Sequence, residues 1–167
     1  MELLVFSDSH GNTDAMNWAL QAQLRRPHGI CFLGDGLRDL DALGESAPVY
    51  AVRGNCDWDS EAKNYPAEML LELEGHTLLL AHGHLYGVKG GVGALLSHAA
   101  VMGADIVLFG HTHTAITETI PVGTQIGSHT LTRPMYVCNP GSIGHVGHSF
   151  GTLLLRGETV LFSHGSV

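Results

Sequence analysis

The chain has 167 residues, of which 44% are hydrophobic and 14% charged, and its formal net charge is -8. This length suits about one domain of roughly 100 to 200 residues, and an acidic chain lacks the basic patch that an extended nucleic-acid surface or an anionic membrane requires. No apolar run is long enough to cross a membrane, and the first residues lack the basic segment of a signal peptide, so we expect a cytoplasmic protein.

Short apolar runs and helical periodicity alternate through the first two thirds of the chain. Strands are predicted at residues 2–7, 30–33, 49–53 and 106–109, with a hairpin of Met69–Leu73 and Thr77–Ala81 turning at Glu74 and Gly75. Helices are predicted at Thr13–Leu24, around Leu40–Leu43 and at Val92–Met102. Met16, Leu20 and Leu24 mark one face of the first helix.

The last third reads as β structure only. Strands are predicted at Ala115–Val122, Tyr136–Cys138, Phe150–Leu155 and Thr159–Ser163, separated by Gly, Pro and Asn turns. Because no Ser/Pro-rich linker or charge block divides the two parts, we expect one domain over residues 1–167. Two sheets packed face to face, with helices outside, would accommodate both parts.

Five of the apolar runs end in the same way, with a small residue followed by an oxygen or nitrogen donor. The donors are Asp8, His10, Asp35, Asn55, His82, His111 and His113. If the strands are parallel, these groups gather at one edge of a sheet, where open α/β sheets bind their ligands. So many polar groups at one edge are unfavourable without a cation or an extensive hydrogen-bond network.

The donor set fits a pair of metal ions better than a single one. Seven donors exceed the needs of one tetrahedral zinc and fall short of two filled octahedral sites, so one carboxylate and one water would bridge two ions. Mixed imidazole and carboxylate ligation favours Mn, Fe, Zn, Ni or Co over Ca or Mg. Such a pair typically promotes hydrolysis of a phosphate ester.

The motifs in their order resemble those of the calcineurin-like metallophosphoesterases, above all the small bacterial and archaeal phosphodiesterases. The matching segments are Asp8-Ser9-His10, Gly34-Asp35, Gly54-Asn55-Cys56-Asp57, His82-Gly83-His84 and Gly110-His111-Thr112-His113, with a familiar turn at Asn139-Pro140-Gly141-Ser142. The resemblance implies a four-layer αββα sandwich of two mixed sheets flanked by helices.

The resemblance also implies a role for each donor. Asp8, His10, Asp35 and His113 would hold the first metal, and Asp35, Asn55, His82 and His111 the second, with Asp35 bridging. Two divalent ions, Mn first among the candidates, would hold a bridging hydroxide as the nucleophile. The substrate implied is a small or nucleotide-like phosphodiester.

One position departs from the pattern. Many members have histidine after the asparagine of the third motif, where it contacts the phosphate, and this chain has Cys56. A thiol is a weak donor that cannot replace a protonated imidazole, so the general acid is left open and good leaving groups are favoured. Asp57, which would orient that histidine, is expected to be structural, and His84 either faces the substrate or supports the ligands.

Two alternatives to the phosphodiesterase remain at this point. One is a non-catalytic scaffold of the same fold, although such members tend to lose metal histidines and all seven donors are present here. The other is a phosphomonoesterase or dinucleoside polyphosphate hydrolase with the same centre and different pocket walls. Exposed strands in the last third allow a homo-oligomer. His145 and His148 follow the Asn-Pro-Gly-Ser turn and could line the pocket, but the sequence does not favour this over a surface position. Arg38 is expected to pair with Asp39 or Asp41.

Overall fold

The computed structural model describes residues 1–44, 46–145 and 147–167. Its β-strands are β1 (Glu2–Phe6), β2 (Gly29–Phe32), β3 (Val49–Ala51), β4 (Glu68–Leu73), β5 (His76–Ala81), β6 (Ile106–Phe109), β7 (Ala115–Ile120), β8 (Gln125–Ile126), β9 (His129–Thr130), β10 (Met135–Pro140), β11 (Ser149–Arg156) and β12 (Thr159–Ser166). Its α-helices are α1 (Thr13–Gln21) and α2 (Gly93–Val101), and short 3-10 helices cover Leu37–Leu43, Ala62–Asn64, His84–Tyr86 and Val88–Gly90.

The strands form two mixed five-stranded sheets and a small β8-β9 ribbon. The first sheet has the order β12-β11-β1-β2-β3, with β1, β2 and β3 parallel and β11 antiparallel to both of its neighbours. The second has the order β4-β5-β6-β10-β7, with β5, β6 and β10 parallel between two antiparallel edge strands. Each parallel core therefore sends its strand ends in one direction, which is what gathers the loops that carry the donors.

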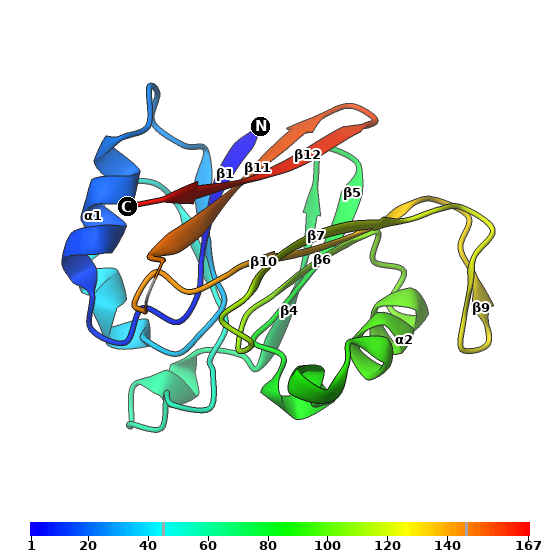
Figure 1. The fold of residues 1–167 in the computed structure, drawn as a ribbon, viewed down its shortest axis with the longest axis horizontal. Coiled ribbons are helices and arrows are strands. Elements are labelled where there is room, and N and C mark those ends of the chain that lie inside the picture. The colour runs from blue at the N-terminus through cyan, green and yellow to red at the C-terminus, as the bar shows by residue number, and fades with distance from the viewer. Residues whose placement is uncertain (45, 146) are drawn as a thin grey trace.

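Three apolar layers hold the sheets and helices together. The two sheets enclose one layer that includes Leu78 and Leu108. A second layer lies between the first sheet and α1, around Met16 and Phe32, and a third between the second sheet and α2, around Leu95. Figure 1 shows α1 and α2 on opposite outer sides of the paired sheets. This arrangement confirms the expected αββα sandwich.

Most predicted elements are found, and the hairpin turn is confirmed in detail. Leu73 pairs with His76 across a two-residue turn in which Glu74 and Gly75 both have positive φ, the geometry that two-residue hairpin turns favour. The pair β8-β9 was not predicted, because two-residue strands leave no periodic signal. The third strand is shorter than expected and ends at Ala51.

The predicted end of the first helix was wrong. The helix stops at Gln21 rather than Leu24, and Leu24 is fully exposed. The side-chain amide of Gln23 donates to the carbonyl of Ala19 at 2.7 Å and so satisfies a carbonyl of the last turn. Arg26, which precedes Pro27, is disfavoured in helical conformation. Leu24 therefore keeps the helical spacing of apolar residues in the sequence, but its side chain does not pack against the core.

Candidate metal centre

The loops that carry the seven donors meet where the parallel strands of both sheets end. We expected one edge of one sheet, but β1, β2 and β3 belong to the first sheet and β5 and β6 to the second. The backbone N–H of His111 donates to Asp8 Oδ2 at 3.1 Å and so joins the two sheets. Gly110 permits this approach, since a Cβ there would lie 1.9 Å from Ser7 Oγ. The site is thus built at the junction of the sheets.

Backbone strain is concentrated at the donors. Among the described residues, seven other than glycine have positive φ, and five of these are donors: Asp8, His10, Asp35, His111 and His113, with φ between 45° and 65°. Left-handed backbone costs an L-residue roughly 1 to 2 kcal/mol, and such strain clusters at functional sites where the surrounding structure enforces it. The strained backbone at these five residues lowers the stability of the fold and orients their side chains toward the site.

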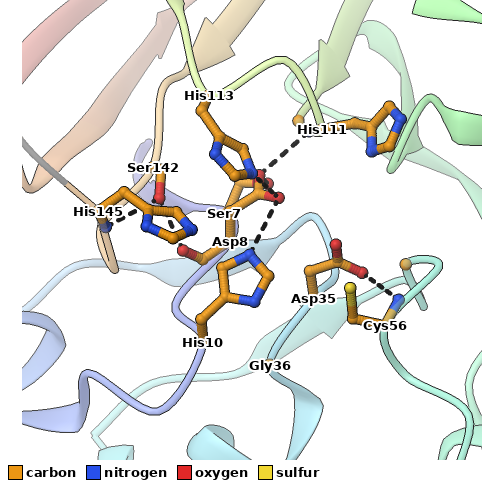
Figure 2. Close-up of polar contacts among 12 residues, drawn as sticks. Ser7, Asp8, His10, Asp35, Gly36, Cys56, His111, His113, Ser142 and His145 are labelled. Carbon is orange, nitrogen blue, oxygen red and sulfur yellow. Dashed lines mark hydrogen bonds and ion pairs between the residues drawn. The ribbon is translucent and has the colours of Figure 1, made fainter.

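One group of donors surrounds the carboxylate of Asp8. Its Oδ2 accepts from the hydroxyl of Ser7 at 2.5 Å as well as from the His111 backbone. Its Oδ1 lies 3.0 Å from Nε2 of His113 and 3.9 Å from Nε2 of His10. The carboxylate is fully buried. One oxygen is fixed by the protein, and the other faces His113 and His10 (Figure 2) and also lies 3.9 Å from Nε2 of His82.

A second group of donors adjoins Asp35. Its Oδ2 lies 3.3 Å from Nε2 of His82, which in turn lies 3.1 Å from Nδ1 of His111. Its Oδ1 accepts from the backbone N–H of Cys56 at 2.7 Å. Burial acts to raise the pKa of Asp35, but the hydrogen bond and charge of His82, together with the hydrogen bonds from Cys56, outweigh it and hold that pKa well below its usual range.

The donor geometry fits divalent metal ions. Ligand atoms bound to one ion at about 2.0 to 2.2 Å must lie within roughly 4.4 Å of each other, and every distance given above within the two groups meets that limit. Asp35, His82 and His111 together place one ligand atom each within 4.8 Å of the others. In addition, Nδ1 of His84 is buried without a hydrogen-bond partner beside His82 and His111. The centre thus contains one polar atom that the described residues leave unsatisfied.

The third motif is organised differently from the other four. Asn55 is exposed, and its amide donates to the sulfur of Cys56 at 3.3 Å instead of contacting His82. Cys56 is also exposed and lies close to His10 and Asp35, with its Sγ within 4.8 Å of a donor atom of each. Burial and the neighbouring Asp35 raise the pKa of the Cys56 thiol to about 11. The structure thus brings Cys56 to the centre, whereas the amide of Asn55 contacts Cys56.

Asp57 fixes the loops beneath the centre. Its two carboxylate oxygens accept four backbone N–H groups at 2.7 to 3.0 Å, from Asp35, Gly36, Leu37 and Gly54. These groups belong to the second and third motifs. The carboxylate therefore holds two donor loops at a fixed separation, in keeping with the structural role that the sequence suggested.

His145, which the sequence did not single out as a site residue, lies at the centre. The imidazole of His145 stacks on that of His113 with ring centroids 4.7 Å apart and lies 4.9 Å from that of His10. One nitrogen of each ring lies within 4.8 Å of the others. The available signal was a histidine three residues after the Asn-Pro-Gly-Ser turn, and that spacing alone does not say which way the loop folds. His148 instead contacts Asn12 and the Ile143 carbonyl.

A small cavity opens beside the donors. It has a volume of about 270 Å³, and its lining includes His10, Asp35, Cys56, Arg38 and Trp58. Trp58 is 82% exposed. Arg38 pairs with Asp59 at 2.9 Å, so the predicted pairing with Asp39 or Asp41 was wrong. Asp39 is engaged elsewhere, because its Oδ2 accepts from Ser9 Oγ.

Comparison with known proteins identifies the family. The model of the calcineurin-like phosphoesterase superfamily domain matches residues 1–159. The chain belongs to this superfamily. It is 32% identical over 144 residues to the probable metallophosphoesterase YsnB of Bacillus subtilis (strain 168), covering 86% of this chain and 75% of that protein. It is 30% identical over 166 residues to the phosphodiesterase YfcE of Escherichia coli (strain K12), covering 86% and 79%.

A solved structure shares the fold at lower identity. The Vps29 protein of Entamoeba histolytica, in complex with Zn²⁺, superposes with a TM-score of 0.72 at 20% identity, covering 99% of both chains. The family and the names of the two relatives indicate phosphoesterase activity, and the family uses divalent metals. In the part of the chain that the structure describes, no helix is both long and apolar enough to span a bilayer.

Proposed function

We propose that the protein is a metal-dependent phosphodiesterase acting on a small, nucleotide-like phosphodiester. The observation that carries this proposal is the convergence of two imidazole and carboxylate groups, around Asp8 and Asp35, at one rim of the fold. Similarity to a phosphodiesterase over 86% of the chain supports it. We propose a single domain of residues 1–167, because β11 pairs with β1 in one sheet and ties the two ends of the chain together. The cytoplasm remains the location that we expect from the sequence.

We assign the ligands in two sets with one shared member. Asp8, His10, Asp35 and His113 form the first set, and Asp35, Asn55, His82 and His111 form the second. Asn55 would bind through its Oδ1, since its Nδ2 donates to Cys56. Manganese leads the candidate ions, followed by Fe, Zn, Ni and Co.

Residues beside the proposed metal ligands hold the ligand loops in place and contact the substrate. When two divalent ions are bound, they polarise the phosphoryl oxygens and activate a water molecule for in-line attack on phosphorus. Asp57 keeps the Asp35 and Asn55 loops in register through its four backbone contacts. Cys56, exposed beside Asp35, offers a substrate oxygen only the weak hydrogen bond of a thiol. The enzyme should therefore favour substrates whose leaving group needs little protonation.

The adjoining cavity suggests what the rest of the substrate is. A volume of about 270 Å³ suits a small molecule rather than a polymer, and Trp58 offers an exposed aromatic face within it. Aromatic side chains stack on nucleobases of any sequence. Trp58→Ala should raise the KM for a nitrophenyl nucleoside diester more than that for nitrophenyl methyl phosphate. An equal effect on both would remove the support for a nucleotide-like substrate.

Relative rates of hydrolysis distinguish a phosphodiesterase from a phosphomonoesterase or a dinucleoside polyphosphate hydrolase. The manganese-loaded protein should cleave a chromogenic phosphodiester faster than a chromogenic monoester or a dinucleoside polyphosphate, and His82→Ala should abolish the difference. A faster monoester or polyphosphate reaction would overturn the diester assignment in favour of that activity.

A scaffold function is favoured by one observation, the likeness to Vps29. At 20% identity this likeness concerns the fold alone. The scaffold proposal predicts a folded protein that hydrolyses no phosphate ester with any first-row metal, whereas the phosphodiesterase proposal predicts turnover.

A further inference from the structure

The loop that carries His145 is fixed against the first motif. Backbone N–H groups of Ile143 and Gly144 donate to the carbonyls of Ser7 and Asp8 at 3.1 and 3.0 Å. The hydroxyl of Ser142 donates to the Asp8 carbonyl at 2.8 Å and accepts from the N–H of His145 at 3.2 Å. The backbone of His145 is therefore anchored to the same strand end that presents Asp8.

Glycine at position 144 allows this close approach. A Cβ there would lie 2.2 Å from the carbonyl oxygen of Ser9 and 2.7 Å from that of Asp8. A side chain would push the loop outward and carry His145 with it. The segment is thus built so that the residue after Gly144 lies over the first motif.

The imidazole of His145 joins two others that we assign to the first metal. Figure 2 shows the rings of His10, His113 and His145 close to one another, with those of His10 and His113 next to the carboxylate of Asp8. Among the described residues, the His145 ring makes these two ring contacts and no hydrogen bond. One nitrogen of each ring lies within 4.8 Å of the others, so the three imidazoles are close enough for one cation to be bound among them.

We propose that His145 is an additional ligand of the first metal, and this inference rests on the proposed metal centre. The first site then offers three imidazoles with Asp8 and Asp35, whereas the second offers two imidazoles with Asp35 and Asn55. Imidazole suits Zn, Ni and Co better than Mn, for which carboxylate oxygens are preferred. The two sites therefore differ in metal preference, and His145 raises the affinity of the first site for zinc more than its affinity for manganese.

Metal binding tests this directly, without reference to activity. Zn²⁺ and Mn²⁺ affinities of metal-stripped protein are measured by competition with a chromophoric chelator, for the natural chain and for His145→Ala, His145→Asp and His148→Ala. His148 lies on the same loop and is the matched control. Loss of a supporting hydrogen bond already weakens metal affinity roughly 10- to 100-fold, so loss of a ligand should weaken the tighter Zn²⁺ site at least about tenfold. His148→Ala should leave it unchanged.

The aspartate variant separates ligation from loop packing. His145→Asp keeps a ligand atom but replaces imidazole with carboxylate, so it should recover Mn²⁺ affinity more than Zn²⁺ affinity. Unchanged Zn²⁺ affinity in His145→Ala, or equal losses in His145→Ala and His148→Ala, would overturn the role of His145 and leave the two-metal centre standing. A natural chain that binds neither ion would overturn the centre itself and His145 with it.

Discussion

Nδ1 of His82 donates to the carbonyl oxygen of Leu33 at a distance of 2.7 Å, and His82 is fully buried. Because a carbonyl only accepts, this bond places a proton on Nδ1, so Nε2, which faces Asp35 and His111, is the nitrogen left to bind a metal ion. Histidines that bind metals are oriented in this way by a carbonyl or carboxylate on the far nitrogen. Leu33 ends the apolar run before Asp35. The same segment therefore supplies the Asp35 carboxylate and the carbonyl that orients the His82 imidazole beside it.

Removing the His82 imidazole should lower the number of metal ions that the protein binds by one. We expect His82→Ala to bind one equivalent of Mn²⁺ or Zn²⁺ where the natural chain binds two, because the second ligand set loses its most buried member. Metal content is measured by elemental analysis after dialysis, with His129→Ala on the exposed strand β9 as the control. Two equivalents in a folded His82→Ala protein would show that this residue is not a ligand.

Asp57 should affect stability as well as activity. Asp57→Asn keeps one acceptor oxygen but turns an amide toward N–H groups that the carboxylate now accepts. Since an unsatisfied buried donor costs about 1 to 3 kcal/mol, we expect the free energy of unfolding in urea to fall by roughly 2 to 4 kcal/mol. Lost activity with unchanged stability would instead place Asp57 in the chemistry.

The strands and the donor loops could be predicted from the sequence, whereas the strand pairing and the loop positions could not. Short apolar runs followed by a small residue and a donor predicted where the strands lie and which loops carry the donors, because buried parallel strands leave that pattern, although the third strand ends two residues earlier than predicted. The distribution of the runs over two sheets was not predicted, since strand pairing depends on long-range contacts. Leu24 misled the helix prediction because periodicity does not report burial. The position of His145 depends on loop packing at Gly144, which the sequence does not encode locally.

The buried pair of His76 and Asp105 should stabilise the end of the molecule away from the metal centre. Nδ1 of His76 lies 2.7 Å from Asp105, and its Nε2 donates to the carbonyl of Gly157 in the β11-β12 turn at 2.9 Å. His76→Phe keeps the ring but removes the imidazole partner of Asp105, which retains Arg133 at 3.4 Å and the N–H of Thr77, so we expect a loss of about 1 to 3 kcal/mol in the free energy of unfolding. Urea unfolding should show this loss while metal content stays the same. A change in metal content would contradict the separation of the two regions.

The buried thiols should make the protein less stable in alkaline solution. Burial raises the pKa of Cys31 and that of Cys138 to about 12, whereas an unfolded thiol titrates near about 8.5. Above that pH the unfolded chain binds fewer protons than the folded protein, so the free energy of unfolding falls as pH rises, by about 1.4 kcal/mol per pH unit for each thiol. Cys31→Ala should show a shallower fall in urea unfolding between about pH 9 and about pH 11. Parallel curves would contradict this account.

The central claim is that two divalent ions held at the junction of the sheets make this chain a phosphodiesterase. The most direct measurement is hydrolysis of a chromogenic phosphodiester by metal-stripped protein as Mn²⁺ is added in increments, beside a chromogenic monoester and the His82→Ala variant. We predict negligible turnover without metal, diester cleavage that rises until two equivalents are bound, slower cleavage of the monoester, and no activity in the variant. Folded, metal-loaded protein that cleaves no diester with Mn, Fe, Zn, Ni or Co would contradict the claim.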